Sequence, residues 1–141
     1  MAQLQRQGVD PATFHHSFFA DLITLQNRTR GAVFEIVGEV LGRTLLGDAE
    51  AAETQHCVDT PYGGRRIDLW YATSRVALEI KSGFIVGSRS IRVQIQKDEW
   101  LLQTGAATRI VWLLFRGATQ RVRDALDRAG IEWYDIEWDK E

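Results

Sequence analysis

The sequence predicts a mixed α/β domain of the α+β type, with a central mixed sheet flanked by helices. Three observations lead to this prediction. Some segments repeat apolar residues every three or four positions, as amphipathic helices do, and others alternate apolar with polar residues, as half-buried strands do. In addition, the continuous apolar run at 109–115 is typical of a central strand that is covered on both faces.

Two helices are expected in the first third of the chain. The first covers residues 17–25, where the apolar side chains fall on one stripe. The second runs from about residue 29 to 41 and is ended by Gly42. Apolar residues cover most of the circumference of this second helix, which we therefore expect to be largely buried. Glu35 interrupts them.

The later elements are expected to follow in a regular order. The expected ranges are a strand at 54–60, a turn at 61–64, strands at 67–71 and within 76–83, a helix at 90–103, a strand at 109–115, a helix at 119–129 and a strand at 131–138. The predicted order is therefore α-β-β-β-α-β, with an extra helix and a C-terminal strand.

Length and composition indicate one domain, spanning residues 1–141, in which residues 1–12 are expected to be loose. No stretch approaches the roughly 20 apolar residues that a membrane span needs, and no segment resembles a signal peptide. We therefore expect no association with a membrane. The single cysteine, Cys57, excludes an internal disulfide.

Positive charge is concentrated in the middle of the chain. The formal net charge is only −2, but residues 65–123 carry +7, and the segments before and after them are both negative. A local basic field favours a polyanionic partner, because neutralised phosphates release counterions. We expect nucleic acid as the partner; the alternative is an ordinary solvated surface. The candidate nucleic-acid-binding residues are Arg65, Arg66, Arg89 and Arg92.

Charged residues interrupt two apolar strands near the centre of the sequence. Glu79 and Lys81 share one face of the strand that begins at Val76, because side chains alternate along a strand. If residues 72–75 form the turn, Asp68 on the preceding strand lies directly across from Glu79, with β-carbons about 5 Å apart. Two carboxylates placed in this way repel each other unless a cation lies between them. The strand pair therefore predicts half of a metal site.

The pattern of Asp68 followed by Glu79-x-Lys81 resembles the PD-(D/E)xK nuclease superfamily, whose members share the restriction-endonuclease-like fold. Ile67 stands where the proline of that motif would be. The resemblance implies a core of helix, three antiparallel strands, helix and strand, with the motif on the second and third strands. It also implies a metal-dependent endonuclease that hydrolyses phosphodiester bonds.

The resemblance further implies a set of metal ligands for Mg²⁺ or Mn²⁺. Asp68, Glu79 and the carbonyl group of Ile80 would bind one or two ions. Members of the superfamily often add an acidic residue from the first core helix, and Glu35 is the candidate for that position here. Glu39, one turn later, is the competing choice.

Lysine and glutamine complete the expected catalytic set. Lys81 would orient or deprotonate the attacking water and balance charge on the phosphate. Gln94 and Lys97 lie on the helix that follows the motif, and in related sequences such residues contact the scissile phosphate. The alternative for both is an ordinary helix surface.

The spacing of further residues resembles nuclease toxin domains of bacterial polymorphic toxins. The similar stretches are Glu79-x-Lys81-x-Gly83, Gln94-x-x-Lys97-Asp98, Trp112-x-x-Phe115 and Leu126-x-x-x-Gly130-Ile131-x-Trp133-Tyr134. This resemblance implies a cognate immunity protein as a partner, and a location in the cytoplasm or within a larger secreted toxin. The alternatives are a repair, Holliday-junction or restriction-type nuclease, and a catalytically inactive nucleic-acid-binding module. The sequence leaves open DNA or RNA as substrate and the oligomeric state.

Overall fold

The computed structural model of the chain describes residues 2–4 and 52–138. The elements are β1 (Ala2–Leu4), β2 (Glu53–Thr60), β3 (Gly63–Tyr71), β4 (Val76–Lys81), α3 (Arg89–Thr104), β5 (Arg109–Leu114), α4 (Gln120–Ala129) and β6 (Glu132–Trp138). They confirm every strand and helix that the sequence predicts after residue 52, with ends that differ by a few residues. The helices expected at 17–25 and 29–41 lie outside the described residues.

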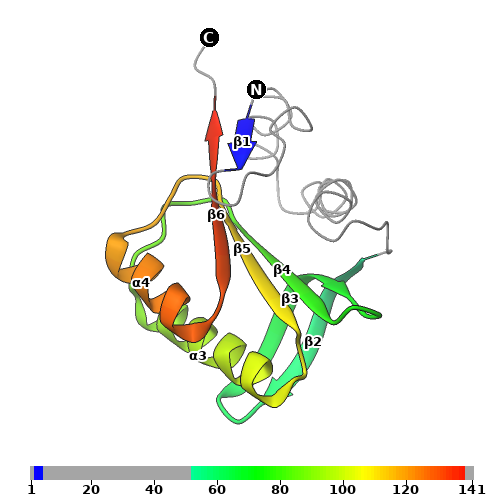
Figure 1. The fold of residues 1–141 in the computed structure, drawn as a ribbon. Helices are drawn as coiled ribbons and strands as arrows, with labels where there is room; N and C mark the ends of the chain where they lie inside the picture. Colours follow the sequence, from blue (N-terminus) through cyan, green and yellow to red (C-terminus); the bar gives the residue numbers. More distant parts are fainter. Residues whose placement is uncertain (1, 5–51, 139–141) are drawn as a thin grey trace.

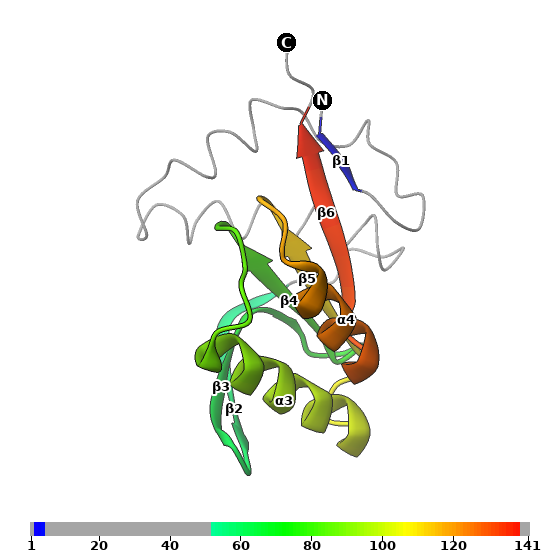
Figure 2. The same ribbon diagram turned by 90° about the vertical axis from the view of Figure 1, so that its left-hand side faces the viewer.

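The sheet is mixed, as predicted, and its order is β1-β6-β5-β4-β3-β2. Strands β2, β3 and β4 form an antiparallel meander. Helix α3 then carries the chain to β5, which is parallel to β4, and α4 carries it to β6, which is parallel to β5. Both helices pack on the same face of the sheet (Figures 1 and 2). The chain therefore passes from antiparallel to parallel pairing at β4, the strand that carries Glu79 and Lys81.

Both helices begin and end at residues that the sequence marks for these positions. The hydroxyl groups of Ser88 and Thr119 accept hydrogen bonds from the backbone N–H groups of the first turns of α3 and α4. Gly105 and Gly130 follow the last turns, with φ angles of 77° and 80°. Only glycine adopts this left-handed conformation without strain, so each helix stops there.

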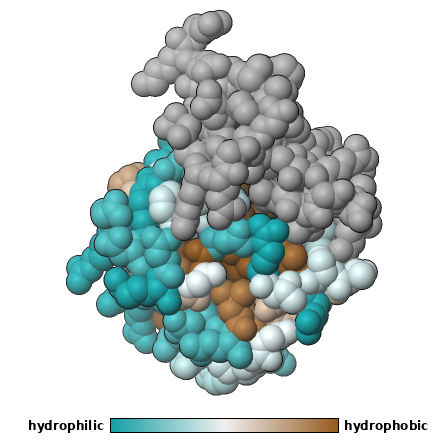
Figure 3. Space-filling view, in the orientation of Figure 1, coloured by the Kyte–Doolittle hydropathy of each residue, from teal (hydrophilic) through white to brown (hydrophobic). Residues whose placement is uncertain are grey.

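The core lies between the sheet and the two helices. Trp112 and Leu114 of β5 face this layer and are completely buried, and Leu101 of α3 and Leu126 of α4 pack in the same cluster. Each such side chain contributes roughly 1.5–3 kcal/mol through burial. Leu113, on the other face of β5, is also completely buried, which confirms the prediction of a central strand covered on both faces. Hydrophilic side chains cover the helices, and hydrophobic ones appear beside the strands (Figure 3).

Two further expectations concern the start of the chain and membranes. Residues 2–4 fall in the segment expected to be loose, but they form β1, where Ala2 pairs with Trp138 of β6. The rest of that segment lies outside the described residues. Neither of the two described helices is long and apolar enough to cross a membrane.

Candidate functional site

The pairing of the two motif strands follows the predicted register. Leu69 lies opposite Leu78, and Tyr71 lies opposite Val76. This is the offset that a turn at residues 72–75 predicts. Regular pairing stops at Leu69 and Leu78, and Asp68 and Glu79 take up the next position on each strand.

The sheet is irregular at Asp68. The ladder between β2 and β3 continues on either side of Asp68 but skips this residue and Gln55, which has a φ angle of 53°. A positive φ is uncommon for a residue other than glycine and indicates local strain. The Asp68 carboxylate instead accepts a hydrogen bond from the backbone N–H of Ile80, 2.9 Å away. This contact holds Asp68 against the strand that carries Glu79.

Glu79 is buried and pairs with two cations. Its side chain accepts a hydrogen bond from Arg65, with an Oε2–Nη2 distance of 2.6 Å, and its Oε1 lies 3.4 Å from Nζ of Lys81. The residue is only 7 % exposed. Burial raises the pKa of Glu79 above its ordinary value, Arg65 opposes this effect, and the neighbouring charge of Asp68 adds to it.

Arg65 links Glu79 to a second buried carboxylate, that of Asp98. The Arg65 Nε lies 2.8 Å from Oδ1 of Asp98, and Asp98 also accepts a hydrogen bond from the indole N–H of Trp112 at 2.9 Å. Arg65 is 5 % exposed and Asp98 is 1 % exposed. Burial raises the pKa of Asp98, and the hydrogen bond from Arg65 opposes the change.

The sequence analysis did not identify Asp98 as a buried group of the site. One signal was available, since Asp98 lies three residues after Ile95 and three before Leu101. These three are the buried residues of α3, so Asp98 lies on the apolar stripe of the helix. A charged side chain in that position needs a partner.

Lys81 and Gln94 meet at the end of β4. The ammonium group of Lys81 donates a hydrogen bond to Oε1 of Gln94 at 2.6 Å and lies 4.8 Å from the ring centroid of Trp112. The predicted catalytic residues Asp68, Glu79, Lys81 and Gln94 are therefore brought together from β3, β4 and α3. Lys97 lines one open pocket with Gln94 and Arg89, and its ammonium group donates a hydrogen bond to the backbone carbonyl of Gly64 at 2.8 Å.

The predicted nucleic-acid-binding arginines divide into two groups. Arg66, Arg89 and Arg92 are exposed, as such a role requires. Arg65 is buried and its guanidinium group is occupied by Glu79 and Asp98. The prediction that Arg65 contacts a nucleic-acid backbone is therefore wrong, because a buried guanidinium between two carboxylates is not accessible to phosphate. Glu35 and Glu39 lie outside the described residues.

The donor atoms of the site fit a hard divalent cation in kind. One carboxylate oxygen of Asp68 accepts a hydrogen bond at 2.9 Å, and one of Glu79 accepts a hydrogen bond at 2.6 Å. The second oxygen of each has only a 3.4 Å contact, from Gln55 to Asp68 and from Lys81 to Glu79. Carboxylate oxygens of this type suit Mg²⁺ or Mn²⁺. Among residues 52–138 no group of three or more His, Cys, Asp or Glu is placed to hold a metal ion. The further ligands that the sequence predicts are the backbone carbonyl of Ile80 and Glu35, and Glu35 lies outside the described residues.

The charges at the site also favour a cation. Asp68, Glu79 and Asp98 contribute three negative charges, and Arg65 and Lys81 contribute two positive ones. When all three carboxylates are ionised, one negative charge is left over, which a bound cation would compensate.

Comparison of the chain with family models, with curated proteins and with solved structures finds no match.

Proposed function

We propose that the chain is a nuclease that depends on Mg²⁺ or Mn²⁺ and hydrolyses phosphodiester bonds of DNA or RNA. The observation that carries this proposal is the position of the Lys81 ammonium group. It lies 3.4 Å from Glu79, the residue across from Asp68 in the strand register, and 2.6 Å from Gln94. A lysine held between a carboxylate and a glutamine, next to carboxylates that suit a divalent cation, can orient an attacking water or balance charge on a phosphate.

The order of elements supports a restriction-endonuclease-like core. Three antiparallel strands, β2 to β4, are followed by α3 and by the parallel strand β5. In that core the motif stands on the second and third strands. Here Asp68 lies on β3, and Glu79 and Lys81 lie on β4.

Each side chain of the site has its own role in the proposed reaction. Asp68, Glu79 and the Ile80 carbonyl, with Glu35 as a further candidate, would hold the cation. When bound, Mg²⁺ or Mn²⁺ lowers the pKa of a water molecule and neutralises charge on the phosphate. Lys81 orients the attacking water or balances the charge of a non-bridging oxygen, and Gln94 holds the ammonium group in place.

The biological role that we propose is that of a toxin or effector nuclease, on the resemblance to nuclease toxin domains. A cognate immunity protein would then protect the cell that makes it. A repair, Holliday-junction or restriction-type nuclease is the alternative within the same chemistry. In either role Lys97 reaches the scissile phosphate only if it releases the carbonyl of Gly64.

One observation favours a second candidate function, that of a nucleic-acid-binding module without catalysis. The guanidinium of Arg65 already neutralises Glu79 at 2.6 Å. If this ion pair persists when nucleic acid binds, Glu79 is less available to a cation, and the cluster is structural.

Incubation of the purified protein with plasmid DNA and with total tRNA tests the proposal. Cleavage of one of the two is expected with Mg²⁺ or Mn²⁺ and none with EDTA. The Asp68→Asn variant should be inactive, while the matched control Asp124→Asn, which changes an exposed aspartate of α4, should remain active. Binding without cleavage under every metal condition would favour the non-catalytic module.

A further inference from the structure

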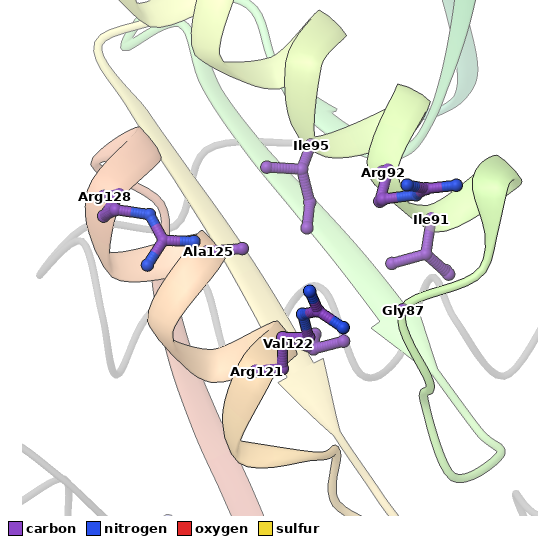
Figure 4. A pocket seen from close by; sticks show the side chains of 8 residues that line it. All are labelled: Gly87, Ile91, Arg92, Ile95, Arg121, Val122, Ala125 and Arg128. Atoms are coloured by element: carbon purple, nitrogen blue, oxygen red, sulfur yellow. The ribbon is translucent and has the colours of Figure 1, made fainter.

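A pocket of about 170 Å³ lies between helices α3 and α4, away from Lys81 and Gln94. Its apolar lining includes Ile91 and Ile95 of α3 and Val122 of α4. Three arginines border it: Arg92 from α3, and Arg121 and Arg128 from α4. In Figure 4 the side chain of Arg121 extends from α4 into the space between the two helices.

The three arginines lack the carboxylate partners that some other arginines have, a property they share with exposed Arg66, Arg89 and Arg116 within the described residues. The guanidinium groups of Arg109 and Arg123 pair with the carboxylates of Glu132 and Asp135. Those of Arg92, Arg121 and Arg128 are exposed and form no hydrogen bond or ion pair with any residue of the described ranges. Three positive charges that have no partner among the described residues border one small pocket, and an anion bound there would reduce their mutual repulsion.

The helix ends add to this positive field. The pocket borders the first turn of α4 at Arg121 and Val122, and the start of α3 at Gly87. Neither helix has an acidic residue in its first turn. Apart from the hydroxyl caps Ser88 and Thr119, the positive ends of both helix dipoles have no acidic partner on their own first turns, and they add to the positive field near the pocket.

The size and the lining of the pocket limit the kind of anion. A carboxylate offers one negative charge, whereas a phosphate monoester carries about −1.5 to −2 and three acceptor oxygens, which match several guanidinium groups. A volume of about 170 Å³ exceeds that of the cavity of roughly 150 Å³ that holds benzene in other proteins, so there is room for the carbon atoms next to the phosphate. Aliphatic side chains suit those carbons, and the lining contains no aromatic ring on which a base would stack.

We propose that the pocket between α3 and α4 binds a phosphate monoester. Arg92, Arg121 and Arg128 hold the phosphate, and the aliphatic residues contact the attached sugar or alkyl carbon. The ester comes either from a small phosphorylated metabolite or from the 5′-phosphate end of a polynucleotide. The proposal does not depend on nuclease activity.

Nuclear magnetic resonance of the arginine Nε–Hε groups tests this site directly. Ribose 5-phosphate is added at constant ionic strength, with chloride as the reference anion. Signals of Arg92, Arg121 and Arg128 are expected to shift, and the affinity should be higher than for inorganic phosphate because of the aliphatic lining. Absence of saturable shifts, or equal shifts with a hexa-aspartate peptide, overturns the proposal.

Substitution of single arginines distinguishes specific binding in the pocket from general electrostatic attraction of an anion. Arg121→Gln should weaken binding of ribose 5-phosphate about tenfold or more, the scale of losing a charged hydrogen bond. Arg75→Gln is the matched control, because Arg75 is an exposed arginine in the turn between β3 and β4. Equal loss in both variants, each confirmed as folded by circular dichroism, contradicts a specific site.

Two further arms identify the source and the charge of the ester. The first experiment compares a hexanucleotide that carries a 5′-phosphate with the same hexanucleotide that ends in a 5′-hydroxyl. Tighter binding of the phosphorylated form identifies the ligand as a polynucleotide end. Equal binding of the two forms, together with tight binding of ribose 5-phosphate, identifies it as a metabolite. Affinity for ribose 5-phosphate should fall below about pH 6, where the monoester loses its second charge. Affinity that does not change across this range is incompatible with recognition of the dianion.

Discussion

Arg65 decides how two buried carboxylates coexist at the candidate site. Its guanidinium lies between Glu79 and Asp98, at 2.6 Å and 2.8 Å. Ionised groups at such low exposure cost several kcal/mol each unless they are paired and hydrogen-bonded. The indole of Trp112 supplies Asp98 with one further hydrogen bond. At the residue scale, the integrity of the site therefore depends on an arginine that belongs to none of the catalytic roles.

The first prediction concerns the removal of that arginine. Arg65→Met is expected to destabilise the protein by about 3–5 kcal/mol, because it leaves two buried carboxylates without their cation. The free energy of unfolding is measured by urea denaturation. Arg66→Met changes the exposed neighbouring residue and should cost no more than about 0.5 kcal/mol. Equal stability of the two variants would show that Glu79 and Asp98 do not depend on Arg65.

The second prediction concerns pH. Burial raises the pKa of both Glu79 and Asp98, and one guanidinium offsets only part of the effect. In the window above the ordinary carboxyl pKa, the folded protein keeps a proton that the unfolded chain has released. This contribution to stability is fully present below the window and is lost as the pH rises through the raised values.

Urea denaturation of wild type and Asp98→Asn between about pH 4 and pH 8 checks the sign. The free energy of unfolding of the wild type should fall relative to that of the variant as the pH rises. Parallel curves would mean that the carboxyl group of Asp98 titrates at its ordinary pKa.

The third prediction follows from the proposed nuclease activity. Glu79→Gln and Lys81→Ala should each lower kcat at least about 100-fold, the scale of losing a positioned charged group. Gln94→Ala should lower kcat by a smaller factor, since it frees the ammonium of Lys81 without removing it. Gln94→Glu keeps an oxygen acceptor and should restore most of the activity. A Gln94→Ala enzyme with changed KM and unchanged kcat would assign Gln94 to substrate binding.

At the scale of elements, α3 joins the two parts of the fold. It connects the antiparallel meander to the parallel strands, and its buried stripe packs on the sheet. Gln94 and Asp98 lie one turn apart on this helix and bind Lys81 and Arg65. The position of α3 on the sheet therefore sets the positions of the Lys81 ammonium and Arg65 guanidinium groups. Gly105 and Gly130 end the two helices that cover the core.

The fourth prediction concerns a helix end. Gly130→Ala should destabilise the protein by about 1–2 kcal/mol, because a residue with a β-carbon is strained at a φ of 80°. The cost comes from the backbone, since the new methyl group would meet Leu102 at an ordinary 3.9 Å. Gly64→Ala is the control, with open space around its β-carbon and no positive φ. Thermal unfolding of both variants should show a loss of stability for Gly130→Ala and none for Gly64→Ala.

At the scale of the whole molecule, the most positively charged part of the sequence is also the part that forms the candidate site. The segment of residues 65–123, with its net charge of +7, contains the candidate site, all of α3 and the start of α4. Exposed Arg66, Arg89 and Arg92 remain from the predicted interface after Arg65 is assigned to the interior. A cationic region around a site with one excess negative charge would attract a polyanion and a divalent cation together.

The fifth prediction concerns substrate binding. A catalytically inactive Asp68→Ala variant should bind single-stranded or duplex nucleic acid with an affinity that falls steeply with salt concentration. Adding Arg89→Gln should lower the slope of log affinity against log salt by about 0.7–0.9, the contribution of one phosphate contact. Fluorescence anisotropy over a series of salt concentrations measures both slopes. An unchanged slope would remove Arg89 from the interface.

The order of the elements after residue 52 and the register of β3 against β4 were determined by the sequence alone. Helix and strand periods, the glycines after α3 and α4, and the turn at residues 72–75 act over short distances along the chain. The approach of Asp68 to the strand of Glu79 follows from this local pattern, and so does the location of Lys81 on the same face.

Only the tertiary structure decided which charged groups meet. Arg65 and Asp98 are separated by 33 residues, and Lys81 and Gln94 by 13. Their contacts depend on how α3 packs against the sheet, which no local pattern specifies. In the sequence Arg65 and Arg66 are equivalent, yet the alternation of β3 buries the first and exposes the second. The arginine pocket has the same origin, because its walls come from two helices that become neighbours only when both pack on one face of the sheet.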